Sequence, residues 1–209
     1  TPDGRTIPKD ISIPQNLFFT GTVNVDETTY MFSPKVLDRA NVIEFNDVNL
    51  IGYSSATEKN VFSFENPDVR NTLMDSEVPA FCSRADYSKF EDITGDGANP
   101  ILELLHLLKK YNLHFGYRVA NEISRFIWLS KDLIGEDFDV NIAMDIQILQ
   151  KILPKFHGTR GKLEDPLKDL HKFCKGEHSE SGALYPHSAI KIARMLKNLE
   201  IQGYTSFIE

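Results

Sequence analysis

The chain has little cysteine: only Cys82 and Cys174 occur in its 209 residues. A disulfide framework needs more cysteines than this, so the sequence predicts a protein of the reducing cytoplasm. It also has no apolar run near the roughly 20 residues that a membrane-spanning helix needs, which predicts no membrane association. The polar start, Thr1-Pro-Asp-Gly-Arg-Thr, lacks the charged and then apolar layout of a secretory signal.

A second absence concerns nucleotide chemistry. The chain contains no Gly-x-x-x-x-Gly-Lys-Ser/Thr loop, the motif whose backbone amides surround the phosphates of a nucleotide. By itself, then, the chain is not expected to hold a nucleotide in that way. Because the sequence starts on a polar stretch without an initiator Met, we also expect it to be a piece of a longer polypeptide.

The overall charge is acidic. The net charge is −7 and the pI is about 5.4, while 41% of the residues are hydrophobic and 25% are charged. This composition is typical of a folded globular protein. Because an acidic surface does not attract nucleic acid or anionic membranes over long range, the charge argues against nucleic-acid binding as the dominant role.

The residue pattern changes character near residue 98. Before it, Leu17–Val23 and Val42–Phe45 are predicted strands, followed by a long polar connection in which 60–65 is a weaker strand candidate and 69–74 a short helix candidate. After it, apolar residues recur at helical spacing. The predicted helices begin near Ile101 and then cover 117–133, 141–153, 163 or 166 to 174, and 188–199, with Ser188 as the N-cap of the last. The fold class predicted is an α/β fragment followed by a mostly α-helical bundle.

Two residues stand where phosphate chemistry would use them. Asn24 ends the apolar run Asn16-Leu-Phe-Phe-Thr-Gly-Thr-Val-Asn24, and an amide at a strand end can orient a water molecule beside a terminal phosphate. Arg39 ends a short predicted helix just before the second strand, and an arginine at a protein edge can stabilise charge on a nucleotide held by a neighbouring subunit.

These motifs resemble a known family. The run Ile13 to Asn24 resembles the strand of the AAA+ fold that carries the sensor 1 residue, and more narrowly that of the McrB family, the NTP-hydrolysing motor subunits of modified-cytosine-dependent restriction systems. Val36-Leu-Asp-Arg-Ala-Asn-Val-Ile-Glu-Phe resembles the segment that bears the arginine finger. Gly116-Tyr-Arg-Val-Ala-Asn-Glu-Ile resembles the start of the lid helix, which carries a sensor 2 arginine. Ile148 to Gly158 and Gly203-Tyr-Thr-Ser-Phe are similar to the later lid.

The resemblance implies a domain plan and a set of roles. Residues 1–48 would be the C-terminal part of an AAA+ α/β core, 49–98 an irregular connection or insertion, and 99–209 a helical lid. Asn24 would position the lytic water or sense the terminal phosphate, Arg39 would act in trans, and Arg118 would couple the lid to the nucleotide. ATP or GTP with Mg would bind in the complete protein, whose phosphate-binding loop and acidic metal ligands would lie upstream of Thr1. The implied partners are further copies in a ring, a nuclease subunit, and DNA contacted through other domains.

The motifs depart from the McrB pattern in two places. McrB-like proteins usually follow the asparagine with Thr-Ala-Asp-Arg, whereas this chain has Val25-Asp26-Glu27-Thr28. The Leu37-Asp38-Arg39-Ala40 helix is also closer to AAA+ relatives in general. The choice between ATP and GTP therefore stays open.

Each candidate residue has a simpler explanation. Asn24 could form a turn, Arg39 could be a surface cation favoured at a helix C-terminus, and Arg118 could pair with Glu122 one turn along its helix. Read this way, the chain is a non-enzymatic helical module, with residues 100–209 docking a protein or nucleic acid.

Other polar groups carry weaker signals. The basic stretch Lys151, Lys155, His157, Arg160 and Lys162 is either a contact for nucleic acid or an acidic subunit, or a solvated loop. The spacing His171-x-x-Cys174-x-x-x-His178 offers only three donors, which is too few for a structural zinc site. No metal site is predicted in this chain.

Overall fold

The computed structural model describes residues 13, 17–23, 32–45, 82–95, 97, 99–176 and 182–208. The chain divides into two units, one formed by Thr1–Val23 and Asn49–Phe81 and the other by Asn24–Val48 and Cys82–Glu209. The predicted elements at 60–65 and 69–74, and the candidate residue Asn24, lie outside the described residues.

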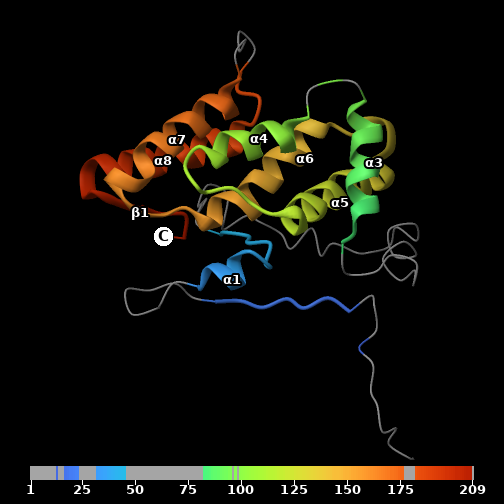
Figure 1. Cartoon of the computed structure of the whole chain (residues 1–209), viewed down its shortest axis with the longest axis horizontal. Helices are drawn as coiled ribbons and strands as arrows, with labels where there is room; N and C mark the ends of the chain where they lie inside the picture. The colour runs from blue at the N-terminus through green and yellow to red at the C-terminus, as the bar shows by residue number, and fades with distance from the viewer. Residues whose placement is uncertain are drawn as a thin grey trace, which may run out of the picture. The chain divides into compact units, whose positions relative to one another are not determined.

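The second unit is mostly helical (Figure 1). Its α-helices are α1 (Pro34–Leu37), α3 (Arg84–Thr94), α4 (Pro100–Lys109), α5 (Tyr117–Ile134), α6 (Val140–Gln147), α7 (Arg160–Lys175) and α8 (Pro186–Gln202). A 3-10 turn, Gly135–Asp137, joins α5 to α6. After α6 the chain continues through a π-helical turn, Ile148–Ile152, and a 3-10 turn, Leu153–Lys155.

The helices share one apolar core. Helix α7 packs along α8, α3 packs across α5, and α6 contacts both α5 and α8. Leu104, Ile123, Ile148, Leu170 and Ile192 are fully buried members of this core. Because residues from all the long helices meet there, burial of apolar surface is the main force that holds the unit together.

A polar contact supports the α3–α5 packing. Ser83 and Asp86 form a capping box at the start of α3. The Asp86 carboxylate also accepts a hydrogen bond of 2.9 Å from the Trp128 indole of α5. The Lys89 ammonium lies 3.6 Å from the centre of a Trp128 ring, a cation–π contact.

A two-stranded ribbon closes the C-terminal part of the unit. Strand β1 (His157–Thr159) pairs antiparallel with β2 (Tyr204–Ser206), with Gly158 opposite Thr205. The ribbon joins the start of α7 to the end of α8, and the N–H of Arg160 donates to the Gly203 carbonyl at 2.9 Å. No strand was predicted here.

The predicted helices are confirmed in place, with changed ends. Helix α4 buries Ile101, Leu104 and Leu108 as expected. Helix α7 begins at Arg160 instead of Leu163 or Pro166, and Pro166 lies inside the helix as one of its buried residues. Burial of Leu163 and Leu167 in the core holds the helix on both sides of the proline. Helix α8 begins at Pro186, and its N-cap is Tyr185 instead of Ser188. Helix α3 falls within the stretch expected to be an irregular connection.

The strands predicted before residue 98 are not observed where the structure describes the chain. Residues 17–23 and 41–45 have no regular secondary structure, and Phe19 and Phe45 are 85% and 90% exposed. A strand needs a neighbouring strand that completes its backbone hydrogen bonds, and among the described residues the strand pairing is that of β1 with β2. Among the described residues, no helix is both long and apolar enough to cross a membrane.

Candidate functional site

The candidate site is built around a short turn, Asp38–Ala40, that follows α1. The helix is closed by a hydrogen bond from the Leu37 amide to the Ser33 carbonyl, and the Ala40 amide donates to Val36 at 3.0 Å. The Leu37 side chain is only 1% exposed, so it anchors the turn to the protein. The α1 helix contacts the 3-10 turn Leu153–Lys155.

The Asp38 carboxylate is held by two cations. Its Oδ2 atom accepts a hydrogen bond of 2.5 Å from Arg118 Nη2, and its Oδ1 atom accepts one of 2.6 Å from Lys155 Nζ. Arg118 lies in the first turn of α5, and Lys155 ends the 3-10 turn after the π-helical turn. Partial burial alone would raise the pKa of Asp38, but the hydrogen bonds and charges of Lys155 and Arg118 outweigh it and keep the pKa below its usual value.

A buried lysine holds the other end of the turn. Lys151 is 0% exposed, and its ammonium donates to the Ala40 carbonyl at 3.1 Å and forms an ion pair with Glu122 of α5. It lies in the π-helical turn Ile148–Ile152, a type of helix distortion that is common at functional sites. The Val42 amide donates to the carbonyl of Gln150 in the same turn at 3.0 Å.

Arg39 lies between these two anchors. It is exposed, and its side chain has no partner among the described residues. Its neighbour Asp38 is already bound to two other cations, and the neighbour on the other side, Ala40, is tied through its carbonyl. The backbone of the turn is thus fixed while the guanidinium remains available to a ligand or another molecule.

A further contact fixes the segment that follows. The Lys191 ammonium of α8 donates to both carboxylate oxygens of Glu44, at 3.0 and 2.8 Å, and lies 4.8 Å from the centre of the Phe207 ring. These residues line a groove of about 300 Å³ together with Ile43 and Ile190. The segment 32–45 is therefore connected to α5, α8 and the π-helical turn.

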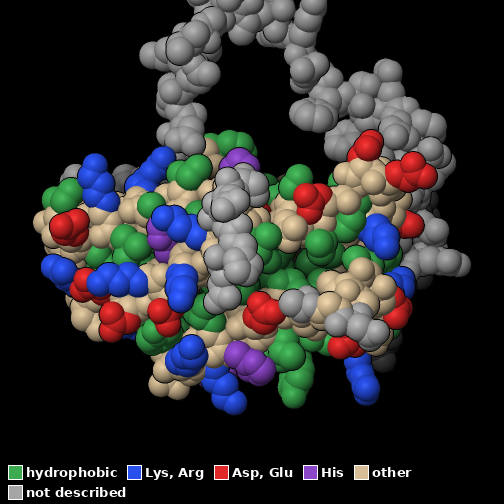
Figure 2. All heavy atoms as spheres, turned by 90° about the horizontal axis from the view of Figure 1, so that it is seen from above, with side chains coloured by type: hydrophobic (Ala, Val, Ile, Leu, Met, Phe, Trp, Pro, Cys, Tyr) green, Lys and Arg blue, Asp and Glu red, His purple; other side chains and the backbone are tan. Residues whose placement is uncertain are grey.

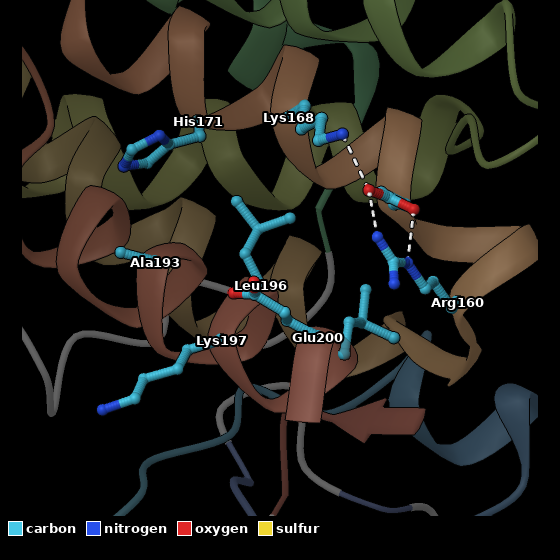
Figure 3. A pocket seen from close by; sticks show the side chains of 9 residues that line it. Arg160, Lys168, His171, Ala193, Leu196, Lys197 and Glu200 are labelled. Atoms are coloured by element: carbon cyan, nitrogen blue, oxygen red, sulfur yellow. Dashed lines mark hydrogen bonds and ion pairs between the residues drawn. The ribbon is translucent and has the colours of Figure 1, made fainter. Parts of the chain in front are cut away.

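A second groove, of about 460 Å³, lies between α7 and α8 (Figure 3). Glu164 pairs there with Arg160 at 2.8 Å and with Lys168 at 2.8 Å, and these hydrogen bonds lower the pKa of Glu164 to about 2. The cations are thus partly neutralised within the groove. His171, which also lines it, has a pKa lowered by burial.

The basic stretch from 151 to 162 is not one continuous free patch. Lys151 pairs with Glu122, Lys155 with Asp38, and Arg160 with Glu164. Figure 2 shows basic and acidic side chains intermingled over the face that it presents. The interpretation of this stretch as a nucleic-acid contact therefore loses three of the five residues on which it depended, and Lys162 stays exposed.

The remaining reactive groups offer no clear chemistry. Cys174 is buried, and burial raises the pKa of its thiol. Cys82 is half-buried, which also raises the pKa of its thiol, although Arg125 lies 4.0 Å from its sulfur. Within the described ranges, no three His, Cys, Asp or Glu side chains gather into a group that could hold a metal ion.

The structure brings two of the three predicted site residues into one region. Arg118 binds Asp38, the residue next to Arg39, whereas the alternative pairing of Arg118 with Glu122 is wrong because Glu122 binds Lys151. Asn24 lies outside the described residues. Sequence reasoning missed Asp38 as a bridging residue, and its two partners, Arg118 and Lys155, lie far from it in the sequence. A partial signal existed only for Lys151, because a lysine among apolar residues that face a core requires a partner.

A protein-family profile, described as a domain of unknown function (DUF8727), matches residues 75–204. The match covers α3 to α8 and ends in β2. No curated protein and no solved structure matches the chain.

Proposed function

The chain belongs to the DUF8727 family, and we propose that it is the C-terminal part of a McrB-like AAA+ NTPase. In this proposal Arg39 completes the nucleotide site of a neighbouring copy in an oligomeric ring. The observation that carries the proposal is the exposed Arg39 guanidinium on a turn fixed at both ends by buried or ion-paired groups. A cation that acts on another subunit's phosphate needs this combination of exposure and fixed position.

The remaining parts of the proposal follow from the resemblance of the motifs. Residues 32–45 would belong to the edge of an AAA+ core, and the helical unit that holds them would be the lid. Asn24 would orient the lytic water. The phosphate-binding loop and the carboxylates for Mg would be supplied by other parts of the complete polypeptide. ATP or GTP is the substrate, and hydrolysis would drive motion on DNA together with a nuclease subunit in a restriction system.

Energetics support a role in trans. Phosphoryl transfer needs little covalent help from the protein, and its transition state gains most from positive charge placed on the transferred group. An arginine supplied by a neighbour raises kcat by roughly 10³–10⁵ in related NTPases. Arg39 has no competing ion pair among the described residues, so its charge is not already neutralised.

The test mixes two inactive variants of the complete protein. Arg39→Ala removes the finger and leaves the nucleotide pocket intact, whereas a substitution of the phosphate-binding lysine does the reverse. We expect each alone to lose hydrolysis and an equimolar mixture to recover part of it, because some interfaces then combine a normal pocket with a normal finger.

Failure to recover hydrolysis in the mixture contradicts a role in trans. If the complete protein lacks a phosphate-binding loop and neither binds nor hydrolyses ATP or GTP, the chain is a helical interaction module and the whole proposal is wrong.

A further inference from the structure

We propose that Arg118 and Asp38 are positioning residues for Arg39, so that Arg118 acts on the neighbouring copy's nucleotide through the finger turn and not on a nucleotide in its own subunit. This inference rests on the proposed function of Arg39. It assigns Arg118 a role different from the sensor 2 contact that the sequence resemblance implied.

The first support is that both oxygens of Asp38 are occupied. Arg118 binds one at 2.5 Å and Lys155 binds the other at 2.6 Å, and the two cations come from different elements, α5 and the 3-10 turn before β1. The carboxylate therefore connects two parts of the helical unit to the turn. The negative charge of Asp38 beside the Arg118 guanidinium also offsets the charge with which Arg118 would attract a phosphate.

The second support is that loss of the ion pair between Arg118 and Asp38 would affect the neighbouring Arg39. Asp38 is adjacent to Arg39 in the chain, and a carboxylate that has lost one of its two cations has a free acceptor oxygen beside the Arg39 guanidinium. Intramolecular pairing would neutralise the finger and turn it away from a neighbouring subunit. The Arg118 contact thus keeps Asp38 from competing for Arg39.

The third support is that the turn is also held from its far side. Lys151 fixes the Ala40 carbonyl, and Lys151 is itself paired with Glu122, one turn along α5 from Arg118. Helix α5 thereby reaches both ends of the turn, through Arg118 on Asp38 and through Glu122 and Lys151 on Ala40. A shift of α5 would be transmitted to Arg39, and a misplacement near 1 Å can cost about 10²-fold in rate.

The exposure of the ion pair makes it suitable for a functional test. The side chains of Arg118 and Asp38 are 49% and 32% exposed, so their pairing adds little to stability because water and salt screen it. Variants of either residue are expected to fold. Their effect on hydrolysis can therefore be separated from a loss of structure.

The experiment uses the complete protein carrying Arg118→Gln, Asp38→Asn or both. We expect each single variant to lose about 10²-fold in kcat while its Kd for ATP or GTP stays unchanged, and the double variant to be no worse than the singles. Asp38→Glu should restore part of the activity because it keeps the charge. Lys131→Gln, an exposed cation near the end of the same helix, is the matched control and should hydrolyse at the parental rate.

An equimolar mixture of Arg118→Gln and Arg39→Ala separates the two roles of Arg118. If Arg118 acts through Arg39, both variants lack a working finger and the mixture stays inactive. If Arg118 contacts the nucleotide of its own subunit, the mixture recovers hydrolysis, and the inference is overturned. Parental hydrolysis by Arg118→Gln alone overturns it as well.

If the proposed function of Arg39 itself is wrong, the mixing experiments give a different result from the one that overturns only the positioning role. In that case the mixture of Arg39→Ala with the phosphate-binding lysine variant also stays inactive, or Arg39→Ala alone hydrolyses at the parental rate. Recovery in that mixture together with recovery in the Arg118→Gln mixture contradicts only the positioning role.

Discussion

At the scale of single residues, Lys151 shows how burial determines what a charged side chain contributes to the stability of the protein. It is fully buried, donates a hydrogen bond to the Ala40 carbonyl and forms an ion pair with the Glu122 carboxylate. Moving a charge out of water costs free energy, and in the folded protein the ion pair between Lys151 and Glu122 offsets this cost. If either residue of this pair is removed, the other keeps a buried charge that no opposite charge offsets.

We therefore predict that Lys151→Met destabilises the protein by about 3–5 kcal/mol, because the mostly buried Glu122 carboxylate then loses its cation. The double variant Lys151→Met with Glu122→Gln should recover part of this loss. Urea unfolding followed by circular dichroism measures both. Arg160→Ala, which breaks an exposed pair, is the control and should leave the unfolding midpoint unchanged. Equal midpoint shifts for Lys151→Met and Arg160→Ala contradict the prediction.

The two cysteines should differ in reactivity. Only the thiolate attacks an alkylating reagent, and burial disfavours that form most strongly at Cys174, which is 0% exposed. We predict that iodoacetamide modifies Cys82 in the folded protein and Cys174 only after unfolding, as measured by mass spectrometry of peptides. In denaturant the two should react alike. Modification of Cys174 as fast as Cys82 in the native state would show that the core around α7 opens readily.

Residue identity alone predicted some of these roles and not others. Arg39 and Arg118 stood out from the sequence because arginine suits phosphate. The partner of Arg118 did not, because Asp38 lies 80 positions away and only the folded chain brings the two together. The nearer candidate, Glu122, pairs instead with Lys151, which is also distant from it in the sequence.

At the scale of elements, α8 depends on a cap supplied by another helix. The N-cap residue Tyr185 provides no side-chain acceptor, and the buried Asp145 carboxylate of α6 accepts instead from the amides of His187 and Ser188, at 2.9 and 2.8 Å. The Ser188 hydroxyl donates back to the Asp145 carbonyl at 3.1 Å. Because the negative charge also faces the positive end of the helix dipole, this contact joins the two helices and stabilises the start of α8.

Asp145→Ala is predicted to cost about 1–3 kcal/mol, because it leaves buried amides without an acceptor. Asp145→Asn keeps one acceptor oxygen and should cost less. The matched comparison is Asp139→Ala, which removes the cap of α6 at an exposed site where water replaces the lost acceptor. Chemical denaturation of the three variants measures the loss in the free energy of unfolding for each and so ranks them. A loss for Asp139→Ala as large as that for Asp145→Ala would contradict the contribution assigned to burial.

The elements also show where sequence patterns succeed. Helices such as α4 and α5 satisfy their own backbone hydrogen bonds, so the spacing of Ile101, Leu104 and Leu108 was sufficient to place one of them. Strands depend on a partner, and the apolar run Leu17–Val23 has none among the described residues. Pro166 was interpreted as a possible helix start, but packing of Leu163 and Leu167 in the core extends α7 through it.

At the scale of the whole molecule, the helical unit holds the turn that carries Arg39. The unit that contains α3 to α8 holds the 38–40 turn through Asp38 and Ala40, and it holds the following segment through the pair of Glu44 with Lys191. In the proposed ring, the position of these helices would determine where Arg39 points. The composition and the helical spacing predicted such a bundle, whereas its connection to the turn became visible only in three dimensions.

The role of Arg39 as a finger in trans is tested by comparing Arg39→Ala with a variant of Lys35, an exposed cation on the same short helix, namely Lys35→Ala. Both variants are made in the complete protein, and NTP hydrolysis and nucleotide Kd are measured for each. A role in trans predicts that Arg39→Ala lowers kcat by roughly 10³-fold or more with an unchanged Kd, while Lys35→Ala behaves as the parent. Hydrolysis by Arg39→Ala at the parental rate would contradict it.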